Sequence, residues 1–334
     1  MDEPLGLNQL LALARAFPAP SGTFDPLGTA SFLHVRVESL DRLAAPDFDR
    51  LAGWLQRLPC PSLALVPAGH ALAAGFDVVS DQPGELERVI AMIRRSPLAA
   101  CVLVQLLRAT EDLAVPAALA CESLAYSTLQ AGPEFRRWRD QTRPQAPAPA
   151  ETGPAILLDR HGTALTLTLN RPGNRNAVTI EMRDALTEAL DLVLADPEIR
   201  SVTLRGAGRC FSVGGDLREF GTAPDPAVAH AIRSVRMPAG RLALCGERLT
   251  ARIHGACIGS GLELPAFATR IVASPNSFFQ LPEVGYGLIP ASGGCVALPR
   301  RIGRQRTALL ALSGRRLSAR TALAWGLVDA IESG

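Results

Sequence analysis

From residue 155 onwards, apolar positions along the chain follow two alternating periods. Residues 164–170 alternate apolar and polar side chains with several β-branched residues, which predicts a strand. Residues 179–194 carry apolar side chains at helical spacing, and Thr179 is the predicted N-cap. Further strands are predicted at 201–205, 251–254 and 327–331, and a short helix at 318–325. Strands that alternate with helices predict an α/β layer fold.

The N-terminal half has a less regular pattern. Strands are predicted at 33–38, 63–66 and 76–79, and a helix at 47–56. Residues 85–139 are predicted to be almost entirely helical, with breaks at Ser96-Pro97, Pro116 and Gly132-Pro133. Because proline is favoured in the first turn of a helix, each break predicts a new helix start. Residues 1–30, rich in Pro, Gly and Ala, are predicted to form a helix followed by a loose arm.

A segment rich in proline and alanine separates the two halves at 145–154 (QAPAPAETGP). Such a composition is stiff and extended and forms no core, so we expect a linker. The predicted organisation is an N-terminal arm at 1–32, a region at 33–144 whose last part is helical, the linker, and an α/β core at 155–334.

Composition limits the classes of function. The 334 residues are 48% hydrophobic and 20% charged, with a net charge of +2, which is typical of a soluble protein and does not favour a nucleic-acid partner. No apolar run approaches the roughly 20 residues of a membrane span. Every basic residue is arginine, which excludes a Schiff-base lysine. Seven cysteines without a C-x-x-C pair, and an acidic start, favour a cytoplasmic protein with reduced thiols.

Cofactor motifs do not occur in the sequence. It has no P-loop, no G-x-G-x-x-G after a strand, no G-x-S-x-G elbow and no clustered metal ligands. We therefore expect neither a metal nor a separate cofactor.

Two glycine-rich segments carry the candidate chemistry, at 206–220 and 254–283. Each is predicted to end a strand with a tight turn and then to open a helix. The first N–H groups of a helix lack internal partners, so two such turns can direct free amides at one oxyanion. The second segment also contains Glu263 and Glu283. An oxyanion hole beside two carboxylates predicts acid–base chemistry next to a carbonyl group.

Five motifs occur in order in this half. They are N-R-P…N-A at 170–177, F-S-V-G-G-D-L at 211–217, G-S-G-L-E-L at 259–264, F-Q-L-P-E…G-L-I-P at 279–290 and A-L-A-W-G-L-V-D at 322–329. In this order and spacing, residues 155–332 resemble the crotonase (enoyl-CoA hydratase/isomerase) superfamily. The resemblance implies a ββα spiral core, an acyl-CoA thioester substrate in which coenzyme A is part of the substrate, a place in fatty acid metabolism, and a homo-oligomer, either a trimer or a hexamer.

The order of the remaining segments differs from that family. Its members continue after G-L-V-D with helices that complete the acyl-CoA site and build a trimer. Here the segment similar to that tail is 85–144, with Ser96-Pro97 between helices and a closing F…R-P pattern, and 76–79 resembles the strand before it. We therefore predict that 33–144 is a degenerate crotonase-like region whose tail helices precede the core, as in a circular permutation or after duplication and partial loss. The alternative is an unrelated helical domain.

The resemblance also implies catalytic roles. The backbone amides of Gly215 and Ser260 are expected to form the oxyanion hole, and Ser260 replaces the glycine that most members have. Glu263 and Glu283 match the two carboxylate positions of the hydratases, whereas isomerases generally keep one. This pair of glutamates favours a hydratase or dehydratase. One alternative is another crotonase-type reaction, such as isomerisation, decarboxylation or thioester hydrolysis. The others are a non-catalytic acyl-CoA-binding partner and two tight turns without chemistry.

Further positions are expected to bind the substrate. By resemblance, the coenzyme A moiety is expected to contact Arg175, Asn176, Ala177 and Val178 mostly through backbone atoms. Arg218 is expected either to reach a phosphate of coenzyme A or to be an ordinary exposed arginine. Tyr286 is expected to shape the acyl pocket, and His254 to be structural. The remaining substrate-binding residues are expected in the two turns: Gly214, Asp216, Gly259 and Gly261.

Overall fold

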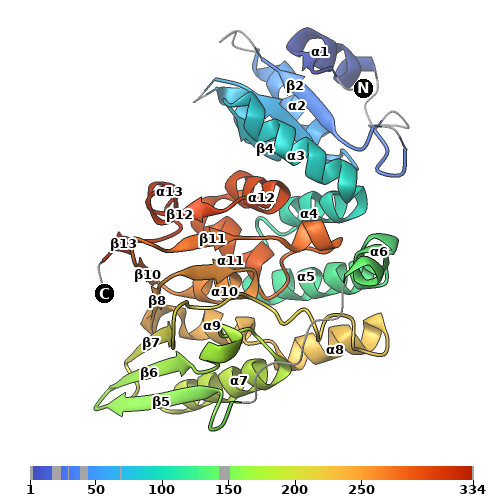
Figure 1. The fold of residues 1–334 in the computed structure, drawn as a ribbon. Helices are drawn as coiled ribbons and strands as arrows, with labels where there is room; N and C mark the ends of the chain where they lie inside the picture. The colour runs from blue at the N-terminus through green and yellow to red at the C-terminus, as the bar shows by residue number, and fades with distance from the viewer. Residues whose placement is uncertain are drawn as a thin grey trace.

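The computed structural model describes residues 3–16, 24–28, 30–37, 44–67, 70–142 and 151–332. A small N-terminal sheet lies at one end of the molecule and a larger α/β core forms most of the rest (Figure 1). A group of helices lies along one side of that core. Most of the predicted linker, at 145–150, lies outside the described residues, as do Arg143-Pro144 and residues 17–23 of the predicted arm.

The N-terminal unit is a parallel sheet with the strand order β1-β2-β3-β4. Its strands are β1 (Leu5–Gly6), β2 (Leu33–Arg36), β3 (Ser62–Leu65) and β4 (Val78–Ser80), and its helices are α1 (Leu7–Ala16) and α2 (Ala45–Gln56). Side chains from the helices and strands, among them Leu51, Trp54, Val35 and Phe76, form a separate apolar core. The predicted strands and the helix at 47–56 are therefore present, and pairing of β1 with β2 extends them into a four-stranded sheet.

Four helices follow this unit, and the last three begin at the breaks that the prolines predict. They are α3 (Pro83–Arg95), α4 (Pro97–Ala109), α5 (Val115–Gln130) and α6 (Pro133–Gln141). Each carries a proline in its first two positions, where the missing N–H removes no internal hydrogen bond. Among the described helices, none is by itself long and apolar enough to cross a membrane; α3 and α4 meet the length and composition only as a pair, across a bend of 112°.

The core contains a six-stranded sheet in the order β13-β10-β8-β7-β6-β5, in which only the β5–β6 pair is antiparallel. Its strands are β5 (Ile156–His161), β6 (Ala164–Leu169), β7 (Ser201–Gly206), β8 (Leu249–Ile253), β10 (Arg270–Ala273) and β13 (Ala330–Ile331). A second sheet is formed by β9 (Ala256–Ile258), β11 (Phe278–Gln280) and β12 (Leu317–Ser318).

The helices of the core surround these sheets (Figure 1). They are α7 (Ile180–Ala195), α8 (Pro226–Arg236), α9 (Ala239–Cys245), α10 (Ser260–Glu263), α11 (Gly294–Ile302), α12 (Arg304–Ser313) and α13 (Ala319–Trp325). The side chain of Thr179 accepts the N–H of Met182 at 3.1 Å, which confirms the predicted N-cap of α7.

Two local predictions were wrong. The turn after β7 opens no helix: α8 begins only at Pro226, because Asp216 accepts the amide of Arg218 in a local turn and Gly215 pairs with Val178 in an isolated bridge. The strand predicted at 327–331 is reduced to β13. The amides of Leu327 and Val328 donate to Ala322 at the end of α13 and are not available to a ladder.

Helix α12 joins the core to the N-terminal unit. The buried carboxylate of Asp77, just before β4, forms ion pairs with Arg108 of α4 and Arg304 of α12. Apolar side chains of α3 and α4, together with Phe32, Leu63 and Val78, belong to the same buried cluster as the core sheet. The helices α3–α6 therefore pack as part of the core, although they precede it in the sequence.

Candidate active site

The two glycine-rich turns touch each other. Gly214 has a φ of +89°, and a Cβ on it would lie 2.5 Å from the carbonyl oxygen of Ile258, just before Gly259. A Cβ on Gly215 would lie 3.7 Å from Oγ of Ser260. Within the part of the chain that the structure describes, the amides of Gly215 and Ser260 donate no hydrogen bond to the protein. Both N–H groups are thus available at one place in the molecule.

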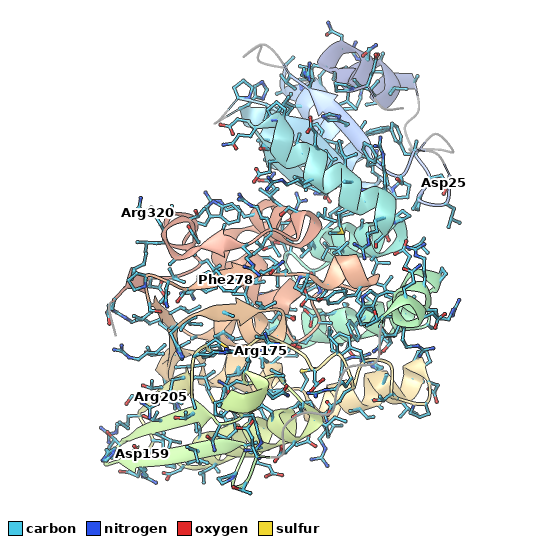
Figure 2. The ribbon with its side chains drawn as sticks, in the orientation of Figure 1. Asp25, Asp159, Arg175, Arg205, Phe278 and Arg320 are labelled. Atoms are coloured by element: carbon cyan, nitrogen blue, oxygen red, sulfur yellow. The ribbon has the colours of Figure 1, made fainter. Side chains whose placement is uncertain are left out.

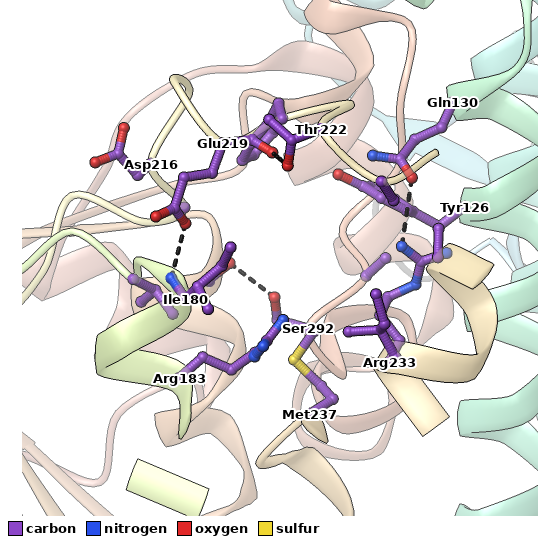
Figure 3. A pocket seen from close by; sticks show the side chains of 18 of the residues that line it. Tyr126, Gln130, Ile180, Arg183, Asp216, Glu219, Thr222, Arg233, Met237 and Ser292 are labelled. Carbon is purple, nitrogen blue, oxygen red and sulfur yellow. Dashed lines mark hydrogen bonds between the residues drawn. The ribbon is translucent and has the colours of Figure 1, made fainter. Parts of the chain in front are cut away.

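A cavity of about 370 Å³ lies against these turns, and Gly215, Ser260, Glu263 and Glu283 all line it. In Figure 3, Tyr126, Gln130 and Arg233 form one side of the cavity, and Asp216, Glu219 and Ile180 lie opposite. The four residues predicted to be catalytic are therefore brought together, from segments separated by up to about seventy residues of sequence.

Glu263 ends the short helix α10 and is 1% exposed. Its Oε2 accepts the amides of Ser292 at 2.6 Å and Gly294 at 3.0 Å. Gly294 has no room for a side chain, since a Cβ there would lie 2.6 Å from Cγ of Glu263. Burial raises the pKa of this carboxyl group to about 7, although the hydrogen bonds from the two amides act to lower the pKa. Glu263 is held rigidly by one oxygen and titrates near neutral pH.

Glu283 follows β11 and is also buried. Among the described residues, its Oε2 has no hydrogen-bond partner, and its Oε1 lies 2.4 Å from the position that a Cβ on Gly259 would occupy. Burial, and secondly the charge of Glu263, raise its pKa well above the usual value. The charge of one carboxyl group thus disfavours ionisation of the other.

A third buried glutamate, Glu122 of α5, completes this arrangement and was missed from the sequence. Its two oxygens accept the amides of Gly293 and Cys295, each at 2.8 Å. Glu263 and Glu122 thus bind alternate amides of the segment that begins α11, from opposite sides. Burial and the charge of Glu263 raise the pKa of Glu122 well above normal.

One pattern in the sequence points to this face of α5. Polar residues recur there at helical spacing within an otherwise apolar helix: Glu122, Ser123, Tyr126, Ser127 and Gln130. Tyr126 and Gln130 line the cavity, so α5 supplies one of its walls. A place beside the cavity is what we expect if residues 85–144 correspond to the C-terminal helices of the family. The permuted origin of the segment stays a prediction.

Helix α6 packs on the outer side of the Glu283 segment. The ring of Trp138 lies 4.8 Å from that of Tyr286, and Gly287 lies so close to Glu134 and Phe135 that a Cβ would approach them to 2.6 Å. Tyr286 does not line the cavity, in contrast to its expected place in the acyl pocket. Its ring is instead taken up by the aromatic packing with α6.

The predicted coenzyme-binding turn follows β6 and contains Arg175 (Figure 2). Arg175 and Asn176 have positive φ values of 54° and 53°, which are uncommon for residues with side chains. The buried side chain of Asn176 locks this turn by donating to the carbonyl groups of Ala207, Cys210 and Phe211. All four amides of 175–178 donate within the protein, and only Val178 of this group lines the cavity.

The other predicted binding residues have mainly structural contacts. Arg218 donates from Nε to Asp216 at 2.7 Å and also binds Asn174, and its hydrogen bond lowers the pKa of Asp216. A Cβ on Gly261 would lie 2.8 Å from Ser212, so this glycine allows the two turns to pack. His254 contacts the carbonyl oxygen of Gly208 at 2.8 Å through Nε2 and does not line the cavity. Within the described residues, no group of three or more His, Cys, Asp or Glu side chains could hold a metal.

Comparison with known proteins identifies the family. The model of the enoyl-CoA hydratase/isomerase family matches residues 159–333, which is more than half of the chain. The chain is 34% identical over 175 residues to mevalonyl-coenzyme A hydratase SIDH of Beauveria bassiana, covering 50% of this chain and 62% of that protein. It is 32% identical over 174 residues to 2,3-dehydroadipyl-CoA hydratase of Escherichia coli, covering 52% and 68%.

Solved structures give the same result. The enoyl-CoA hydratase of Thermoplasma volcanium is 32% identical, with a TM-score of 0.50, over 55% of this chain and 73% of that one. The chain belongs to the enoyl-CoA hydratase/isomerase family of enzymes, in the crotonase superfamily. The part that matches spans 62% of the length of the Beauveria relative and 68% of the Escherichia coli relative, and the residues before 159 lie outside the family match.

Proposed function

We propose that the protein adds water to, or removes it from, a 2-enoyl-CoA thioester in the cavity described above. The observation that carries this proposal is the pair of buried carboxyl groups, Glu263 and Glu283, beside two amides that donate to nothing in the described protein. Two N–H groups at Gly215 and Ser260 suit a thioester oxygen that becomes negatively charged, and such donors can lower a barrier by several kcal/mol.

The different environments of the two glutamates assign their roles. Glu263, with a pKa of about 7, can accept a proton from water while its Oε2 stays bound to Ser292 and Gly294. Burial and the charge of Glu263 raise the pKa of Glu283 well above normal, which favours its protonated form as the proton donor. As the water oxygen bonds to C3, Glu263 takes a proton from the water and Glu283 delivers one to C2. Proton exchange between the two carboxyl groups then restores the starting state.

The serine at the second turn is compatible with this chemistry. Oγ of Ser260 lies 2.7 Å from Oγ of Ser292, so the two hydroxyl groups are hydrogen-bonded to each other. The backbone N–H of Ser260 is unaffected by that bond. We therefore expect the amide of Ser260 to donate to the oxyanion as the amide of a glycine would. We also expect the coenzyme A part of the substrate to bind along the same two turns.

The test is hydration of crotonyl-CoA by the full chain, followed by loss of the enoyl absorbance. We expect Glu263→Gln and Glu283→Gln each to lower kcat by roughly 10²- to 10⁴-fold, since each removes one step of proton transfer. Glu188→Gln is the matched control, because Glu188 is exposed on α7, and its kcat should be unchanged.

Mass spectrometry of the product separates the possible reactions. A gain of the mass of water supports the hydratase proposal, whereas an isomer, a decarboxylated product or free coenzyme A identifies another reaction of the family. Hydration that proceeds unchanged in both glutamine variants contradicts the assignment of the two glutamates.

A further inference from the structure

A second cavity of about 490 Å³ lies next to the first, between α5, α8 and α9. Arg233, Met237 and Ala291 line both cavities and so mark the boundary between them. Most of the other lining residues are apolar, including Val115, Leu119, Ala243 and Leu244. The arginine is therefore a cation placed where the first cavity meets a largely apolar space.

The contacts of Arg233 are all neutral. Its Nε donates to Oγ of Ser123 at 3.1 Å, and the terminal nitrogens donate to the carbonyl oxygen of Ser123, to Oγ of Ser127 and, at 3.4 Å, to Oε1 of Gln130. The guanidinium lies 4.6 Å above the ring of Tyr126 (Figure 3). None of the described carboxylates forms an ion pair with it, unlike the paired Arg183 on the opposite wall. Arg233 is half-buried, and taking a cation partly out of water is costly without an opposite charge.

Burial lowers the pKa of Arg233, and the charges of Tyr126 and the neighbouring Glu122 raise it, although Glu122 forms no ion pair with Arg233 among the described residues. Glu122 lines the second cavity, but both of its oxygens accept backbone amides of the α11 segment. Tyr126 connects the arginine to the reacting groups: its pKa is raised first by burial and then by the charges of Glu263 and Glu283, and Arg233 acts in the opposite direction. Arg233, Tyr126, Glu263 and Glu283 all line the first cavity.

We propose that Arg233 binds a carboxylate at the far end of the acyl group, so that the substrate is a dicarboxylic acyl-CoA and not a plain alkyl thioester. Four of the five N–H groups of the guanidinium are used in the contacts named above, and the fifth, on Nη1, can donate to a carboxylate oxygen. The ring of Tyr126 and the serines of α5 fix the orientation of the guanidinium. This inference rests on the proposed binding of an acyl-CoA in the first cavity, but not on hydration as the reaction.

The test is calorimetric binding of saturated acyl-CoA pairs of equal chain length: succinyl- against butyryl-CoA, adipyl- against hexanoyl-CoA, and suberyl- against octanoyl-CoA. We expect the wild type to bind one dicarboxylic member more tightly than its neutral partner. Arg233→Met should weaken that ligand by roughly tenfold to a hundredfold, as loss of a charge-assisted hydrogen bond predicts, with little change for the neutral ligand. Arg233→Lys should recover part of the preference.

The control is Arg241→Met, which removes a cation that lines the second cavity but is already paired with Asp191 at 2.5 Å. It should leave the ratio of the two affinities unchanged. Because Arg233 also joins α8 to α5, its replacement can lower stability, but the ratio of two ligands on one variant is independent of the folded fraction.

Two results would overturn the proposal: equal affinity of the wild type for both members of every pair, or an equal loss for both in Arg233→Met. The outcomes separate this inference from the proposed reaction. Binding of dicarboxylic ligands through Arg233 without hydration of enoyl thioesters contradicts only the reaction, and hydration without a dicarboxylic preference contradicts only this inference.

Discussion

The molecule contains two parallel sheets with different contents. The strands β1–β4 and the parallel strands β6, β7, β8, β10 and β13 both have helices packed on them and apolar cores. Among the described residues of the N-terminal unit no glutamate is buried, whereas Glu263 and Glu283 are buried in the core and Glu122 joins them from α5. Parallel strands alone therefore do not make a site. The proposed chemistry depends on the glycine-rich turns that follow β7 and β9, which belong to the two different sheets of the core, and on the helix that covers these turns.

The largest effect is expected where the two regions meet. Asp77→Ala should lower the free energy of unfolding by about 3 to 5 kcal/mol, because it leaves the buried guanidinium groups of Arg108 and Arg304 without their shared carboxylate. Chemical denaturation measures the loss. At a temperature where the variant stays folded, kcat with crotonyl-CoA should match that of the wild type. A large fall in kcat of folded protein would show that the N-terminal unit takes part in catalysis.

The next effect concerns one glycine of the catalytic turn. Gly259 has a φ of +50°, and a Cβ there would lie 2.4 Å from Oε1 of Glu283. Gly259→Ala must displace the carboxyl group or the turn, and we expect kcat to fall by at least about a hundredfold, as for a misplacement of about 1 Å. The control is Gly84→Ala in α3, where nothing lies within 4 Å of the new methyl group, and its kcat and Tm should be at least those of the wild type. Equal behaviour of the two variants would contradict the assigned geometry.

A smaller effect is expected from pH. The pKa of Glu263 is about 7 in the folded protein and near its usual 4.5 when unfolded, so the folded state holds a proton that the unfolded state releases between these values. The stabilisation that Glu263 gains from its bound proton is fully present below pH 4.5 and is lost as the pH rises through about 7. Relative to Glu263→Gln, the wild type should therefore lose about 2 kcal/mol of unfolding free energy between pH 5 and pH 8. If the difference in unfolding free energy between the wild type and Glu263→Gln stays constant from pH 5 to pH 8, Glu263 has an ordinary pKa.

The smallest predicted effect tests the link between α5 and the core. Glu122→Gln keeps one acceptor but turns an amide group towards either Gly293 or Cys295, and we expect a loss of about 1 kcal/mol in unfolding free energy. The activity should fall as well, because the same segment carries the amides of Ser292 and Gly294 that hold Glu263. A change in stability with an unaltered pH dependence of kcat would limit Glu122 to a role in folding.

Much of the site could be predicted from local pattern. Gly214, Gly215, Ser260, Glu263 and Glu283 lie within motifs whose spacing places them at strand ends, and the structure brings all of them to the same pair of turns. Glu122 and Arg233 could not be found in this way. They come from helices α5 and α8, and their importance depends on contacts with segments more than a hundred residues away.

The sequence by itself determined the alternation of strands and helices, the proline-marked starts of α4–α6, and the two glycine turns with their glutamates, because these features depend on backbone conformations that neighbouring residues dictate. Only the tertiary structure decided that α5 forms a wall of the cavity, that Tyr286 packs against α6, and that the turn after β7 opens no helix. Those outcomes depend on burial and on hydrogen bonds between distant segments, such as the amides of Gly293 and Cys295 with Glu122, which no local pattern encodes.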